Sequence, residues 1–217
     1  MAEMNDSFNE VTAEMLKVIS DYDSVTGFQG AYNIRQDSMC AGRKNSENIT
    51  IESKTDKPGI NIRVKPGTKG ETVYIPACVT HSNVDDLVYN DFFIGEGADV
   101  TIVAGCGVHS DGSETARHNG IHRFFLEKGA KVLYKEKHIG TGKGTGLRRI
   151  DPVTDAYLKE DSYLEMDTVQ LRGVDRTTRS TSAVLEKGAK IVVRERIMTD
   201  GDEDAVTKFK GELNGED

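Results

Sequence analysis

Thiol and imidazole side chains are concentrated in one short segment of the chain. The sequence has three cysteines and five histidines, and four of these lie within seventeen positions, at Cys106, His109, His118 and His122. The segment reads Cys-x2-His-x8-His-x3-His, and thiolate with imidazole is a donor set that suits tetrahedral zinc or iron. The spacing therefore predicts a metal site made of these four residues.

The backbone between the four residues decides whether they can meet. In a strand His118 and His122 share one face, whereas Cys106 and His109 differ by three positions and need a turn between them. The glycines on either side of Cys106 are candidates for that turn. The alternative interpretation is structural: the two histidines are hydrogen-bonded core residues, and Cys106 is a small buried apolar residue.

Three other patterns resemble reactive sites, but each lacks part of its motif. Cys78 and His81 have no orienting third group or oxyanion site, so we interpret them as packing residues. The glycine-rich segment 140–146 lacks a Ser or Thr after its lysine and a following helix, which favours a corner between structural units over a phosphate loop. Asp85 and Asp86 would face opposite sides of a strand, which disfavours a carbohydrate-active enzyme, as does the lack of an aromatic stripe.

Length and composition limit the classes of function. The 217 residues carry a net charge of −8, which argues against general nucleic-acid binding. No apolar run reaches the roughly 20 residues that span a bilayer, and the N-terminus lacks the pattern of a secretory signal. We therefore expect a soluble, cytoplasmic protein, and the odd number of cysteines favours reduced thiols.

The periodicity of apolar residues changes near residue 30. Residues 8–22 carry apolar side chains at helical spacing, and Ser7 with Glu10 forms a candidate capping box. Farther along, Ile49 with Ile51 and then the segment 60–64 alternate with polar neighbours, as in strands. We predict an N-terminal helical segment and linker over residues 1–30 and a β domain over residues 31–217.

The β domain contains an internal repeat. Residues 92–100 are echoed by residues 124–132 and 183–191, residues 156–164 fit with Asp-Ser in place of Gly-Ala, and residues 62–67 form a degenerate earlier copy. The copies lie roughly 30 residues apart, and each is a strand, a tight corner and a second strand. Equivalent positions form apolar columns: Phe92, Phe124, Ala156 and Ala183; Ile94, Leu126, Leu158 and Leu185; Ala98, Ala130, Ser162 and Ala189; Val100, Val132, Leu164 and Ile191.

Stacking these columns predicts an all-β fold, a parallel β-helix (solenoid) with a short N-terminal helix. The crossover rule for parallel strands favours the right hand. A β-propeller is the alternative, but its blades need about 40 residues and usually carry Trp-Asp signals.

Three segments resemble the SufB/SufD family of iron–sulfur cluster assembly scaffold proteins. They are residues 118–130 (HNGIHRFFLEKGA), 177–180 (TTRS) and 185–189 (LEKGA), and the similarity runs from about residue 30 to the end. The resemblance implies a right-handed parallel β-helix, pairing with another SufB/SufD-type subunit and binding of the ATPase SufC through C-terminal helices. Family chains continue past the end of this sequence, so we expect the C-terminal part to be lacking, and no family site residue has a matching position here.

The resemblance implies a non-enzymatic component of the SUF machinery, a scaffold or partner subunit that handles a transient iron–sulfur cluster. Because a solenoid that stops between coils leaves an open edge, we also expect a homodimer or larger homo-oligomer formed near residues 185–213. Two other hypotheses are a structural β-helix that binds one zinc or iron ion through Cys106, His109, His118 and His122, and a carbohydrate-active enzyme.

Overall fold

The computed structural model describes residues 7–22 and 26–215, which contain one helix and fifteen strands. The elements are α1 (Glu10–Ile19), β1 (Ala31–Gln36), β2 (Met39–Lys44), β3 (Ile49–Ser53), β4 (Gly59–Val64), β5 (Lys69–Val79), β6 (Asp85–Ile94), β7 (Asp99–His109), β8 (Ala116–Leu126), β9 (Lys131–Thr141), β10 (Arg148–Ile150), β11 (Val153–Leu158), β12 (Tyr163–Gln170), β13 (Arg176–Leu185), β14 (Lys190–Ile197) and β15 (Asp204–Leu213).

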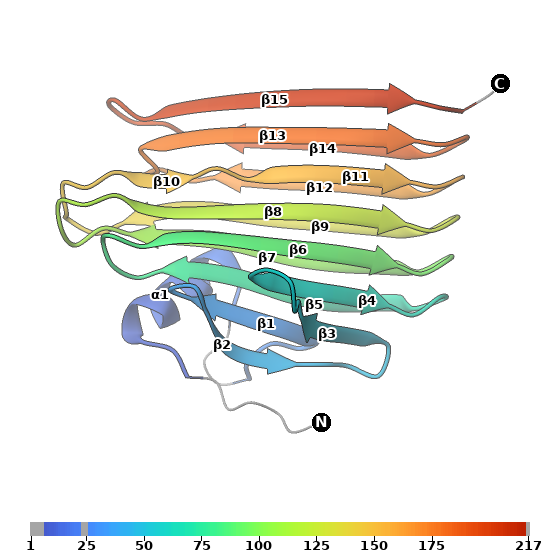
Figure 1. Ribbon diagram of the computed structural model, residues 1–217, viewed down its shortest axis with the longest axis horizontal. Helices are drawn as coiled ribbons and strands as arrows, with labels where there is room; N and C mark the ends of the chain where they lie inside the picture. Colours follow the sequence, from blue (N-terminus) through green and yellow to red (C-terminus); the bar gives the residue numbers. More distant parts are fainter. Residues whose placement is uncertain (1–6, 23–25, 216–217) are drawn as a thin grey trace.

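The strands form two facing sheets that enclose one narrow tube (Figure 1). The first sheet has the order β14-β12-β9-β7-β5-β1-β2, and the second has the order β10-β13-β11-β8-β6-β4-β3, with β15 beside β13. One strand of each sheet makes a coil, so β4 with β5, β6 with β7, β8 with β9, β11 with β12, and β13 with β14 are successive coils. The roughly 30-residue repeat is thus one wide coil, which confirms the predicted parallel β-helix.

The predicted columns are stacked in register. Ile94 pairs with Leu126, which is followed by Leu158 and Leu185 on the next strands. In the other sheet, the same in-register stacking on successive strands occurs for the column Val100, Val132, Leu164 and Ile191. The column residues are buried in every coil except the last, where Ala189 and Ile191 are partly buried, so the repeat builds a continuous apolar core.

The corner of each repeat has one residue with positive φ. Gly97, Gly129 and Gly188 have φ of 63°, 65° and 70°, and Asp161 takes the same role at 58°. Glycine adopts this conformation without steric cost, and Asp tolerates it better than most residues. The Asp-Ser variation in the fourth copy therefore preserves the corner.

The N-terminal end of the tube uses antiparallel pairing instead of another parallel coil. β2 pairs antiparallel with β1, and β3 pairs antiparallel with β4. β3 and β4 lie where sequence periodicity predicts strands, but the hairpin direction was not predicted. These hairpins place β2 and β3 at the ends of the two sheets.

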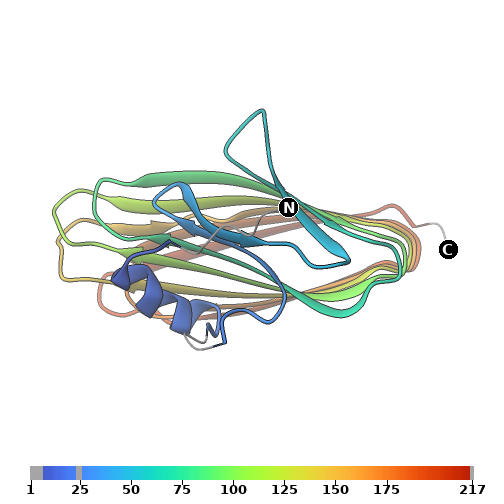
Figure 2. The ribbon, with the colours of Figure 1, turned by 90° about the horizontal axis from the view of Figure 1, so that it is seen from below.

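α1 lies along the outside of the first sheet, against β5, β7 and β9 (Figure 2). The predicted helix near residues 8–22 is confirmed in a shorter form, but the predicted capping box is wrong. Asn9 is the N-cap and accepts from the Thr12 amide, whereas the Ser7 amide donates to the Ala41 carbonyl. This helix is not long and apolar enough to cross a membrane, and no other helix occurs in the described residues.

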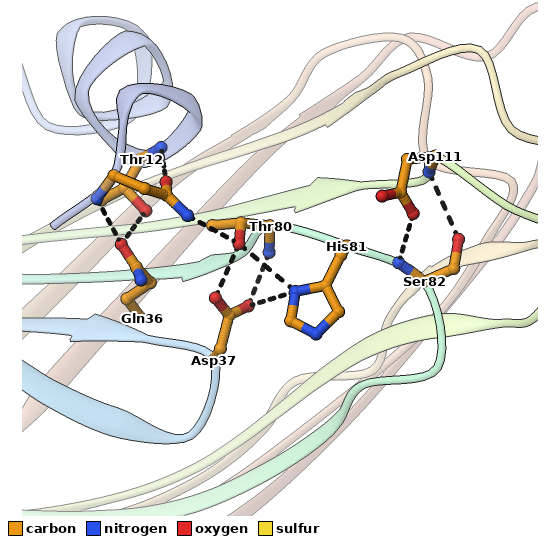
Figure 3. A network of polar contacts seen from close by, with 8 residues as sticks. Thr12, Gln36, Asp37, Thr80, His81, Ser82 and Asp111 are labelled. Atoms are coloured by element: carbon orange, nitrogen blue, oxygen red, sulfur yellow. Dashed lines mark hydrogen bonds and ion pairs between the residues drawn. The ribbon is translucent and has the colours of Figure 1, made fainter.

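Polar contacts attach the start of α1 to the first coils (Figure 3). The Asn9 amide group donates to Thr80 Oγ1, and its backbone N–H donates to Gln36 Oε1. Thr80 in turn donates to Asp37. Asn9 caps the helix in place of the predicted Ser7, because the Asn9 side chain also binds the β domain.

Candidate functional site

The interior of the tube is apolar at the repeat corners and polar in its middle. The apolar part includes Phe92 and Phe124, whose rings stack at 4.4 Å. The polar part comes from inward-facing positions of β6, β7, β8, β9 and β13, and its buried members are Asp86, Cys106, His118, His122, Tyr134, Glu136, His138 and Arg179. Buried ionisable groups are costly without partners, so this cluster is the candidate functional site.

Cys106, Glu136 and His138 lie together in the first sheet. Cys106 on β7 pairs in register with His138 on β9, and Glu136 precedes His138 by two residues on the same face. One potential ligand atom from each residue lies within 4.8 Å of those from the other two. A thiol, a carboxylate and an imidazole thus converge in a place that is nearly sealed from solvent.

Glu136 is bound from two sides. Tyr134 donates to Oε1 at 2.8 Å, and Arg179 donates from Nη1 to Oε2 at 2.9 Å. Burial opposes ionisation, but His138 and Arg179 outweigh it and hold the pKa of Glu136 well below its usual range. Burial, with the nearby charge of Glu136, raises the pKa of the Cys106 thiol well above its ordinary value. Glu136 is therefore ionised and Cys106 is a protonated thiol near neutral pH.

His122 is a neutral imidazole in this network. Because the Tyr134 hydroxyl donates to Glu136, His122 Nδ1 is assigned as the donor to Tyr134, at 2.9 Å. His122 Nε2 then accepts from the Asn90 amide at 3.4 Å. Burial lowers the pKa of His122 to about 4, in agreement with this assignment.

His118 belongs to a separate ion-paired group. Its Nδ1 lies 3.0 Å from Asp86 Oδ2, and Arg35 binds the same carboxylate through Nε and Nη2. Burial opposes ionisation of Asp86, but the bonds to His118 and Arg35 outweigh it and hold its pKa below the usual range. Asp85, its neighbour in sequence, is exposed, so the two carboxylates face opposite sides as predicted.

A cavity of about 230 Å³ leads into the polar cluster from the N-terminal end of the tube. Its wall includes Met39, which is 71% exposed, and reaches the buried residues Cys106, His118 and His122. Gly120 lies between the two histidines, and a Cβ there would meet His122 Nε2 at 2.9 Å. The two imidazoles therefore occupy the place that a side chain at position 120 would need.

The structure places three of the four predicted ligands inside the tube and the fourth outside it, but the potential ligand atoms that converge among the described residues are those of Cys106, Glu136 and His138. Cys106, His118 and His122 face the interior, but His109 lies on the outer face of β7 and contacts Thr141 Oγ1 at 2.9 Å. The four-residue set therefore does not form one tetrahedral site. His109 is on the wrong face because β7 continues as a strand with no turn after Cys106.

The glycines beside Cys106 have a different role from the predicted one. A Cβ at Gly105 would lie 2.5 Å from the Ile19 carbonyl oxygen, and one at Gly107 would lie 2.4 Å from Met15 Sδ. Both glycines let α1 pack closely against the back of the strand. Sequence reasoning also missed Glu136 and His138, although the alternation after Val132 places them on the inward face.

The remaining patterns are structural. Cys78 packs under α1 and burial raises the pKa of its thiol, while His81 contacts Asp37, so the two form no reactive pair. Segment 140–146 is a corner stacked on the preceding coil, where a Cβ at Gly142 would lie 2.1 Å from the Ser110 carbonyl oxygen.

The predicted lack of an aromatic stripe is wrong. Phe93, Phe125 and Tyr157 stack on the outside of the second sheet at 5.1 and 5.2 Å. On the same sheet Asp91 is buried and bound by Arg123 and Lys54. Because this carboxylate is held in ion pairs, it is a poor general acid or base, and the carbohydrate hypothesis gains no support.

Fold and site together define a parallel β-helix protein with a thiol, carboxylate and imidazole cluster inside its tube. Over 89 residues the chain is 32% identical to an iron–sulfur cluster assembly SufBD family protein from Methanothermobacter thermautotrophicus (strain Winter). It is 30% identical over 89 residues to an iron–sulfur cluster assembly SufBD family protein from the Delta H strain of that organism.

Both matches cover 40% of this chain and 21% of the relative, so the likeness spans about a fifth of each relative's length. No family model matches the chain. The two relatives confirm the resemblance to the SufB/SufD family that the sequence motifs indicate.

Proposed function

We propose that this chain is a component of an iron–sulfur cluster assembly machinery, as a scaffold or a partner subunit of a scaffold complex. The observation that carries the proposal is the similarity to two SufBD family proteins. A thiol held inside a rigid tube next to a cavity is consistent with it, because cysteine sulfur is the usual ligand of iron in such clusters. The chain acts by holding and positioning this cargo and is not itself an enzyme.

The number and placement of thiols favour a shared site over a complete one. Iron–sulfur clusters usually need four cysteine ligands, and this chain has three cysteines. Cys78 packs under α1 on the opposite side of the first sheet from the tube interior, whereas Cys40 and Cys106 both line the cavity. A complete cluster therefore needs other ligand types or residues from a partner subunit.

The partners follow from the family resemblance. We propose that the chain pairs with a SufB/SufD-type subunit and works with a SufC-type ATPase, in the cytoplasm. A complex of this kind would supply the nucleotide hydrolysis and the additional ligands that the described residues do not provide.

Anaerobic reconstitution of the chain with its proposed partners, iron and sulfide tests the function. The wild-type complex is expected to gain the visible sulfur-to-iron absorption of a cluster, and Cys106→Ser is expected to reduce it. Cys78→Ser is the matched control, because this thiol is equally buried but lies outside the tube. A wild-type complex that gains no such absorption would exclude the scaffold role.

A further inference from the structure

We infer that Cys106, Glu136 and His138 form a binding site for one divalent transition-metal ion, iron(II) or zinc(II), inside the tube. The identity of iron as the physiological ion rests on the proposed function, whereas the site itself rests on the geometry of these residues. The sequence predicts Cys106 with His109, His118 and His122. The proposed site keeps Cys106, but its other two ligands are Glu136 and His138.

The three donor atoms are already close to a coordinating arrangement. They lie within 4.8 Å of one another, and ligands about 2.0–2.3 Å from a tetrahedral metal are about 3.6 Å apart. Cys106 and His138 are direct neighbours in the β7–β9 register, and Glu136 lies on the same face of β9. Small side-chain rotations therefore bring the donors to bonding distance without a change in the backbone.

One of the three donor atoms makes no hydrogen bond. His138 Nε2 is buried and makes no hydrogen bond to any described atom. Oε2 of Glu136 lies 3.3 Å away as an ion-pair contact, but not in hydrogen-bonding geometry. A fully buried imidazole nitrogen that lies near a carboxylate oxygen but makes no hydrogen bond needs an explanation, and a metal ion between this nitrogen and Glu136 supplies one.

The charge around the site fits a divalent cation. Glu136 and Glu195 each contribute one negative charge and Arg179, which binds both, contributes one positive charge. When Cys106 loses its proton to the solvent and binds as a thiolate, the net charge of the group becomes two negative charges. A divalent ion neutralises it, and it also provides the counter-charge that a buried thiolate otherwise lacks.

Arg179 sets a condition on binding. Its Nη2 lies 3.5 Å from His138 Nδ1, so Nδ1 is oriented as an acceptor. Metal binding at Nε2 moves the imidazole proton to Nδ1, which then needs an acceptor, so the guanidinium must shift away from it. The contact of Arg179 Nε with Glu195, at 3.2 Å, provides a second carboxylate that can hold the shifted guanidinium.

The cavity gives the ion a route and suggests that the site exchanges its metal. Cys106 forms part of the cavity wall, so the site is not sealed on that side. The same wall carries four basic residues, Arg35, Arg43, Lys54 and Lys57, of which Arg35 and Lys54 are ion-paired with Asp86 and Asp91, so a cation passes a wall whose positive charge is only partly neutralised. Three protein ligands leave one tetrahedral position open, as in sites that bind an exchangeable fourth ligand.

Titration of the full chain with Co²⁺ after removal of metal by a chelator tests the site. The wild type is expected to bind about one equivalent and to gain the absorption of a cobalt–thiolate bond. Cys106→Ser is expected to abolish this absorption, and His138→Gln to weaken Co²⁺ binding about tenfold or more. Cys78→Ser and His109→Gln are matched controls outside the tube and should bind as the wild type does.

A cobalt–thiolate absorption that persists in Cys106→Ser, or that is absent from the wild type, would overturn the inference. Circular dichroism reports whether each variant folds. A second measurement needs no variant: zinc X-ray absorption of the wild type should show one sulfur with nitrogen and oxygen neighbours, and a shell without sulfur also overturns the site.

The metal site and the proposed function can fail separately. If Co²⁺ binds as expected but the complex assembles no cluster, the proposed function is wrong and the metal site stands. If the complex assembles a cluster but Co²⁺ forms no thiolate bond, the metal site is wrong and the proposed function stands.

Discussion

Arg179 and Glu136 come from opposite sheets of the tube and bind each other inside it, with Nη1 to Oε2 at 2.9 Å. Arg179 lies on β13 and Glu136 on β9, and 6% and 2% of their side chains are exposed. This ion pair ties the two sheets together through the polar part of the core, where apolar packing is lacking.

Arg179→Gln is expected to destabilise the fold strongly. The change leaves the Glu136 carboxylate buried without its counter-charge, and removing one partner of a buried ion pair typically costs about 3–5 kcal/mol. Urea unfolding at neutral pH measures the loss. A loss of unfolding free energy below about 1 kcal/mol would show that the ion pair does not stabilise the packing of the two sheets.

The double variant Glu136→Gln with Arg179→Gln separates the pair from its surroundings. Two neutral amides leave no uncompensated charge. The double variant should therefore lose less unfolding free energy than the sum of the losses of the two single variants, and we expect the difference to be roughly 0.5–3 kcal/mol. Strict additivity would mean that the two side chains act independently.

Acid should destabilise the protein between about pH 6.5 and pH 4 because of His122. Burial lowers the pKa of this imidazole to about 4 in the folded state, so the unfolded chain takes up the proton first as the pH falls. The contribution of His122 to the free energy of unfolding is fully present above the pKa of the unfolded state, about 6.5. Below that pH it falls by at most about 1.4 kcal/mol per pH unit.

His122→Gln should flatten this acid dependence. Urea unfolding from pH 7.5 to pH 4 gives the slope for the wild type and the variant, and the difference at pH 7.5 reports the change in packing alone. His138 is also buried with a lowered pKa, so part of the slope should remain. Identical slopes would contradict the assignment of His122 as a neutral core group.

Gly129→Ala should destabilise the fold by about 1–2 kcal/mol through the backbone alone. Gly129 has φ of 65°, which is unfavourable for alanine by about that amount, and a Cβ there would meet nothing within 4 Å. Thermal unfolding measures the effect. Lys131→Ala, an exposed strand position two residues later, is the control and should change stability by less than about 0.5 kcal/mol.

The exposed apolar side chains of β15 should lead to self-association. β15 pairs on one side with β13, and its apolar side chains Val206, Phe209 and Leu213 are exposed. We predict a homodimer or larger assembly through β14 and β15, which Phe209→Asp with Leu213→Asp would convert to monomer. Light scattering measures the mass, and a wild-type monomer at micromolar concentration would exclude this prediction.

The coil structure could be predicted because its signal is repeated. A single alternating strand is ambiguous, but Ile94, Leu126 and Leu158 recur with the same corner after each, and the same register explains every copy. The antiparallel hairpin of β3 and β4 was not predictable in this way, because it occurs once and lies outside the repeat.

The candidate site was only partly predictable. His118 and His122 were placed on one face by their spacing, but Glu136 was passed over because a charged residue in a strand is usually exposed. Val132, Tyr134 and Glu136 alternate on one face, so the parity was available in the sequence. Arg179 was beyond sequence reasoning, because its meeting with Glu136 depends on how the coils stack across two sheets.

The close packing of α1 has a consequence for the thiol. Gly105 and Gly107 touch Ile19 and Met15 on one side of β7, and Cys106 projects from the other side. A single thickness of polypeptide therefore divides the helix from the sulfur, so a side chain larger than glycine at position 105 or 107 would push α1 away from the strand that carries Cys106.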